Sequence, residues 1–90
     1  MDLEQPTAET TVVLARVPVG SHVRIERILG GRLLVHRLLG LGLRVGSEVE
    51  LTHRRGGGVV LASAGARVAL GAGVAEKLLV LPLAPKNRTS

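Results

Sequence analysis

Three histidines and two glutamates are the side chains in this chain with the best chance of holding a metal ion. His22, His36 and His53 lie far apart in the sequence, so no two of them have the i, i+4 spacing that places two ligands on one helix face. Glu48 and Glu50 alternate with apolar residues, which would put both carboxylates on one strand face, where they could bind a hard cation weakly. Cysteine is absent. Because no coherent ligand set emerges, we expect no bound metal and no cofactor.

The serines and the glycine-rich runs show no catalytic or nucleotide-binding pattern. Ser21 precedes His22, but neighbouring residues of a strand point to opposite faces. The sequence shows no histidine–acid pair beside any serine, although a triad assembled from distant residues stays open. The runs 30–31 and 56–58 lack both the GxxxxGK[ST] pattern and the strand–loop–helix context of GxGxxG. We therefore expect turns at these glycines, and a protein that is not an enzyme.

Hydrophobic periodicity predicts the strands that would position these residues. Apolar residues alternate over five short segments: 22–27, 47–52, 59–62, 66–70 and 78–81. Ile28 breaks the alternation, so the first strand should end or bulge near Arg27. His53 directly follows the segment 47–52, and the alternation would turn its side chain inward, to the same side as the apolar residues of that segment. The segment 12–17 is expected to be extended or loop-like, and Pro82 should end the last strand or place it at a sheet edge.

Between the first two strands the period changes to that of a helix. The predicted helix begins at Arg32 and has an apolar stripe with i, i+4 and i+7 spacing, formed by Leu34, Leu38 and Leu41. His36 and Arg37 fall on the polar side of this helix, and so does Leu33. Gly42 suits the left-handed position that commonly ends a helix. The residues 43–46 should form a turn into the next strand.

Short strands joined by glycine turns favour a small barrel, because closing the sheet removes the exposed edges that promote aggregation. We predict a mainly β fold, an SH3-like barrel of about five strands with one inserted α-helix, over residues 12–83. The segments 1–11 and 84–90 have too little apolar content to offset the entropy of ordering them, so both are predicted to be disordered tails. The first tail is acidic.

Composition and charge further limit the range of possible functions. Phe, Tyr and Trp are absent, which disfavours aromatic peptide grooves and base-stacking platforms. Residues 12–83 carry ten basic and four acidic side chains. Such a surface suits an acidic protein, a nucleic acid or an anionic leaflet, but it is also ordinary for a soluble protein. No apolar run approaches the length of about 20 residues that spans a bilayer. With no signal-peptide pattern either, we expect a cytoplasmic protein.

The order and spacing of the apolar and glycine positions resemble the FeoA family, small cytoplasmic proteins of bacterial ferrous iron uptake. The pattern opens with an apolar residue, another three on and a glycine three after that: Leu14, Val17 and Gly20. Its most specific part is Arg-Leu-x-x-Leu-Gly-Leu, a two-residue spacer and Gly, which residues 37–46 match. Val45 departs from the family, which usually has Pro at that position to pre-set the turn. Later matching positions are Gly65, Ala69-Leu70, and Ala75 to Val80.

The resemblance implies an SH3-like fold and a role as an accessory to FeoB, the membrane ferrous iron transporter with a cytoplasmic GTP-binding domain. The fold also resembles the C-terminal domain of DtxR-type metal-dependent repressors, although the 90 residues leave no room for their DNA-binding helices. We therefore expect a non-enzymatic regulator that docks on the cytoplasmic part of FeoB and does not itself bind nucleic acid or span a membrane. A nucleic-acid-binding barrel and a metal-sensing domain are the alternatives, and self-association stays open.

The predicted helix and the turn after it are the best candidate for a partner site. An exposed Leu33 beside His36 and Arg37 would be an aliphatic residue rimmed by charge, a common mark of an interface. The alternative is that Leu33 packs under the Gly30-Gly31 turn. Arginines on the glycine hairpin could also contact an acidic partner, or be merely solvated. The predicted partner-binding residues are Leu33, His36, Arg37, Arg44, Arg54 and Arg55.

Overall fold

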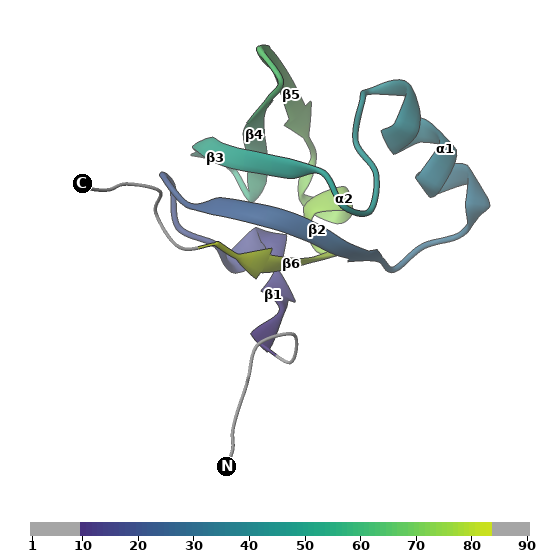
Figure 1. Cartoon of the computed structure of the whole chain (residues 1–90), viewed down its shortest axis with the longest axis horizontal. Coiled ribbons are helices and arrows are strands. Elements are labelled where there is room, and N and C mark those ends of the chain that lie inside the picture. Colours follow the sequence, from purple (N-terminus) through teal and green to yellow (C-terminus); the bar gives the residue numbers. More distant parts are fainter. Residues whose placement is uncertain (1–9, 84–90) are drawn as a thin grey trace.

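A computed structural model describes residues 10–83 of the chain, which hold six strands and two α-helices (Figure 1). In chain order the elements are β1 (Val12–Val13), the 3-10 helix η2 (Leu14–Arg16), β2 (His22–Ile28), α1 (Arg32–Gly40), β3 (Glu48–Arg55), β4 (Gly58–Ser63), β5 (Ala66–Leu70), α2 (Ala72–Ala75) and β6 (Leu78–Pro82). The tails predicted over 1–11 and 84–90 lie outside the described residues, apart from Thr10 and Thr11.

All six strands join one antiparallel sheet with the order β1-β6-β2-β3-β4-β5. The short helices bridge distant parts of this curled sheet, since η2 contacts β6 and α2, and α2 also contacts β4. The mainly β architecture with a helix inserted after the first long strand is confirmed. The strand number is six rather than about five, because Val12 and Val13 pair with Val80 and Leu79 along an otherwise unpaired side of β6.

The core is aliphatic throughout. The alternating residues of β2 to β6 supply most of it, and no polar or charged side chain within residues 10–83 is buried. Complete burial of a Leu or Val side chain contributes roughly 1.5–3 kcal/mol. A single cluster of Leu, Val, Ile and Ala therefore holds together a domain that has no disulfide.

Two bulges decide which side chains of β2 and β3 face the core. The register of β2 against β6 shifts between Ile25 and Arg27, which confirms the predicted irregularity. A second shift in β3 makes Thr52 the extra residue, and its hydroxyl donates to the Val60 carbonyl over 3.2 Å. One extra residue reverses the side-chain parity of a strand. The inward parity predicted for His53 is therefore wrong, and His53 is exposed on a strand that continues to Arg55.

The glycine hairpin between β3 and β4 is tighter than its sequence suggests. Gly56 and Gly57 form a two-residue turn with φ of 56° and 87°, the mirror-image geometry that suits β-hairpins. Gly58, expected in the loop, is the first residue of β4. Ala64 and Gly65 repeat this arrangement between β4 and β5, with φ of 51° and 84°.

Candidate functional site

Helix α1 lies to one side of the curled sheet (Figure 1) and enters the core at one position only. Leu38 is fully buried, and Leu34 is partly buried against the core cluster. The predicted third member of this stripe, Leu41, is 45% exposed, so the stripe is shorter than expected. The reason is that the chain turns immediately after the helix, and Leu43 enters the core instead of Leu41.

The end of α1 is held by a left-handed glycine cap. Gly42 has φ of 86°, and its N–H donates to the Leu39 carbonyl over 2.9 Å. The Leu43 N–H donates to the Leu38 carbonyl over 2.8 Å, and both leucine side chains belong to the same buried cluster. These two bonds and the paired leucines are the Schellman arrangement. The predicted role of Gly42 is confirmed, and the cap fixes the direction in which the chain leaves α1 and returns to the sheet.

Large aliphatic side chains gather on the outside of α1 and its following turn. Five of the eight exposed large hydrophobic residues among residues 10–83 lie between positions 33 and 45. Leu33 is 88% exposed, so it does not pack under the preceding glycine turn. Leu34 occupies that place, since a Cβ added at Gly30 would stand 2.5 Å from its Cδ2 atom. Exposed aliphatic residues concentrated in one short segment of a small protein suit an interface.

The charges on the same segment have one sign. Positions 32–47 contain three arginines and a histidine and no carboxylate, and all four of these basic side chains are exposed. Within residues 10–83, none of the three arginines has an ion-pair partner. We call this set the α1 surface; it comprises Leu33, Val35, Leu39, Leu41, Val45, Arg32, His36, Arg37 and Arg44.

Arg54 is hydrogen-bonded to a distant part of the same domain. Its guanidinium donates to the backbone carbonyls of Ala15 and Val17, at the end of η2. These carbonyls lie 39 and 37 residues earlier in the chain. The side chain therefore fastens β3 to the N-terminal part of the barrel, a contact that no local sequence pattern indicates.

Replacing Arg54 with methionine is expected to lower the free energy of unfolding by about 1–2 kcal/mol, because two carbonyls lose a charged donor. Methionine keeps an aliphatic stem of similar reach. Urea denaturation of the wild-type chain and the variant measures the change. Arg55→Met is the matched control, since Arg55 makes no such bond within residues 10–83. Equal stability of the two variants would show that the Arg54 contacts contribute nothing.

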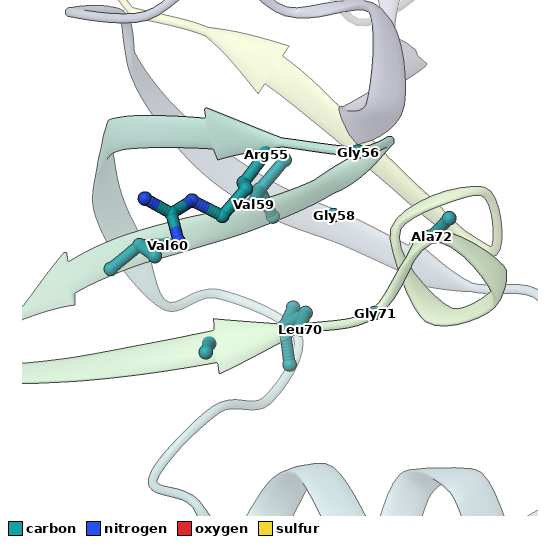
Figure 2. Close-up of a pocket in the computed structure, with 9 residues that line it drawn as sticks. Arg55, Gly56, Gly58, Val59, Val60, Leu70, Gly71 and Ala72 are labelled. Atoms are coloured by element: carbon teal, nitrogen blue, oxygen red, sulfur yellow. The ribbon is translucent and has the colours of Figure 1, made fainter.

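Arg55 lies at the rim of a shallow pocket of about 350 Å³ between the glycine hairpin and β5 (Figure 2). It is the one charged residue of a lining that is otherwise apolar or glycine, including Val59, Val60 and Leu70. The predicted partner residues thus fall in two places. Leu33, His36, Arg37 and Arg44 belong to the α1 surface, and Arg54 and Arg55 lie at the end of β3.

The histidines and glutamates do not gather in one place. His22 and Glu26 lie on β2, Glu48, Glu50 and His53 lie on β3, and His36 lies on α1. Within residues 10–83, no three His, Asp or Glu side chains lie close enough to hold a metal ion. His22 Nε2 is 3.8 Å from Glu50 Oε1 across the β2–β3 pair. Arg24 faces Glu48 in the same register and bonds Glu26 over 2.7 Å, and this hydrogen bond and charge raise the pKa of Arg24. Both glutamates of β3 therefore have basic residues opposite them.

Three comparisons relate the chain to known proteins. The family model described as "FeoA domain" matches residues 12–82. A putative Fe(2+) transport protein A of Methanocaldococcus jannaschii is 30% identical over 67 residues, which cover 74% of this chain and 82% of the relative. The crystal structure of an iron uptake regulatory protein (FeoA) has a TM-score of 0.75 and 27% identity, over 82% of this chain and 99% of that one.

A structure of a manganese-dependent transcriptional repressor is also similar, with a TM-score of 0.77 and 23% identity. The match covers 87% of this chain but 44% of the repressor, and at this identity it concerns the fold alone. The predicted SH3-like fold, and its relation to repressor domains, are confirmed. Among the described residues, no helix has the length and apolarity needed to cross a bilayer.

Proposed function

The chain belongs to the FeoA family of ferrous iron transport proteins, and we propose that it is a non-enzymatic accessory protein that docks on the cytoplasmic part of a FeoB-type transporter. The protein would then be located in the cytoplasm. A regulator of this kind shifts its partner between states, which requires a different affinity for each of them. Transport accessory proteins need no catalytic site of their own, which fits the dispersed polar residues of this barrel.

The observation that supports this proposal is the α1 surface. Helix α1 contributes little to the core of the barrel, because only Leu38 of its nine residues is fully buried. Leu33, Val35 and Leu39 are exposed to water, on a segment whose arginines have no ion-pair partner within residues 10–83. Exposed aliphatic groups interleaved with arginine suit the contact with another protein.

Leu33→Glu and Arg37→Glu are each expected to weaken binding to the soluble GTP-binding domain of FeoB from the same organism by roughly tenfold or more. Leu33 would lose apolar contact with the partner, and Arg37 would present the wrong charge. Calorimetric titration, with and without guanine nucleotide, measures the affinity. Both side chains are exposed, so the stability of the barrel should change by less than about 0.5 kcal/mol.

Val19→Glu and Arg67→Glu are the matched controls, since both residues are exposed and lie outside the α1 surface, Val19 in the turn before β2 and Arg67 on β5. Unchanged binding in both α1 variants would overturn the proposed surface. Absence of binding to the GTP-binding domain and to the complete transporter in detergent would overturn the proposed function. A difference between nucleotide states would identify the state that the chain favours.

A further inference from the structure

We infer that the α1 surface binds an acidic amphipathic segment, a short stretch of protein in which Asp or Glu side chains flank aliphatic ones. That this segment belongs to the transporter rests on the proposed function. The chemistry of the segment follows from the α1 surface itself, through its shape, its charge and the way its two kinds of side chain are mixed.

The shape of α1 favours an elongated occupant. Residues four apart lie one above the other on a helix, so Val35 stands beside Leu39 and Leu33 beside Arg37. Gly40 follows Leu33 by two turns, and an added Cβ there would meet nothing within 4 Å. A partner segment can therefore approach the backbone in the last turn while its aliphatic side chains contact the exposed leucines.

The charge of the α1 surface determines the sign of the charge that its occupant carries. Arg32, Arg37 and Arg44 have no carboxylate beside them between positions 32 and 47. Two copies of this chain meeting through α1 would bring these guanidinium groups together, and like charges across an interface oppose association. A segment with Asp or Glu would instead supply the missing partners, so the occupant is acidic rather than a second α1.

The mixing of charged and aliphatic side chains favours a protein over a lipid surface or a nucleic acid. Helices that lie on membranes separate a charged face from an apolar one, whereas Leu33, His36 and Arg37 occupy the same side of α1. Phosphate contacts give nucleic-acid affinity but leave aliphatic side chains without a counterpart. An exposed leucine beside arginine, as at Leu33 and Arg37, is matched by a partner that offers both apolar and acidic groups.

Three fluorescent synthetic peptides of equal length test the inference against the whole chain. The first peptide has Leu at positions i, i+3, i+4 and i+7, and Glu is its only charged residue. The second has Lys in place of Glu, and the third has Ser in place of Leu. We expect only the first to bind, with affinity that falls as NaCl rises. Leu33→Glu and Arg37→Glu should each weaken it roughly tenfold or more, while Val19→Glu and Arg67→Glu should not.

Binding of the lysine peptide, or equal binding of the serine peptide, would overturn the inference. So would binding to phosphatidylglycerol vesicles or to duplex DNA that is tighter than to the first peptide and equally sensitive to Leu33→Glu. If the FeoB domain binds but neither α1 variant weakens it, the inference fails and the proposed function stands. If the first peptide binds as expected while the domain and the complete transporter do not, the proposed function fails and the inference stands.

Discussion

Leu38→Ala is expected to lower the free energy of unfolding by about 2–5 kcal/mol, the usual cost of emptying a leucine site in a closed core. Leu38 is the only residue of α1 that is fully buried. Alanine is the best helix former, so the loss would come from the cavity and not from helix propensity. The backbone of Leu38 also accepts the N–H groups of Leu41 and Leu43, so a displaced helix would strain its own cap.

Urea denaturation followed by circular dichroism measures this effect. The matched control is Leu39→Ala, which removes the same atoms from a neighbouring side chain that is 54% exposed. That control should change the stability by less than about 0.5 kcal/mol. Similar losses in the two variants would show that α1 packs on the barrel through a different face. A loss confined to Leu38 would confirm that its side chain is the main anchor of the helix.

Gly58→Ala is expected to lower the free energy of unfolding by about 1–3 kcal/mol, the usual cost of forcing extra atoms into a packed site. An added Cβ at Gly58 would stand 2.8 Å from the carbonyl oxygen of Leu70 and 3.4 Å from that of Arg55. Both neighbours are backbone atoms of strands, so they cannot rotate away as a side chain would. The start of β4 would have to move relative to β5.

Thermal and urea unfolding of Gly58→Ala should be compared with that of Gly73→Ala. Gly73 lies within α2, and an added Cβ there would meet nothing within 4 Å. Alanine in a helix is favoured over glycine, so the control should be neutral or slightly stabilising. A Gly58→Ala variant as stable as the control would mean that the hairpin accommodates the methyl group without moving the strands.

The attachment of α1 by few contacts suits a docking role. A helix held by Leu38, Leu34 and a glycine cap keeps most of its surface for a partner without weakening the core. A similar fold occurs in an iron uptake regulatory protein and in part of a manganese-dependent repressor. Because one fold hosts different functions, the function of this chain has to be argued from the α1 surface rather than from the barrel.

Features that depend on neighbours in the sequence could be predicted from the residues alone. Alternating apolar residues indicated the strands, the change of period indicated α1, and Gly42 indicated where α1 ends. The irregularity near Arg27 was also predicted, because Ile28 interrupts a local pattern. The exposed position of Leu33 was one of two alternatives, since helical periodicity gives the side of a helix but not what lies next to it.

Features that depend on pairing across the chain were decided only by the tertiary structure. The bulge at Thr52 turns His53 outward, and it arises from the register of β3 against β4. Arg54 meets the carbonyls of Ala15 and Val17, which lie 39 and 37 residues away in the chain. Leu41 stays exposed because Leu43 takes the core position beyond the cap. Periodicity constrains each segment separately, whereas these contacts depend on how separate segments meet.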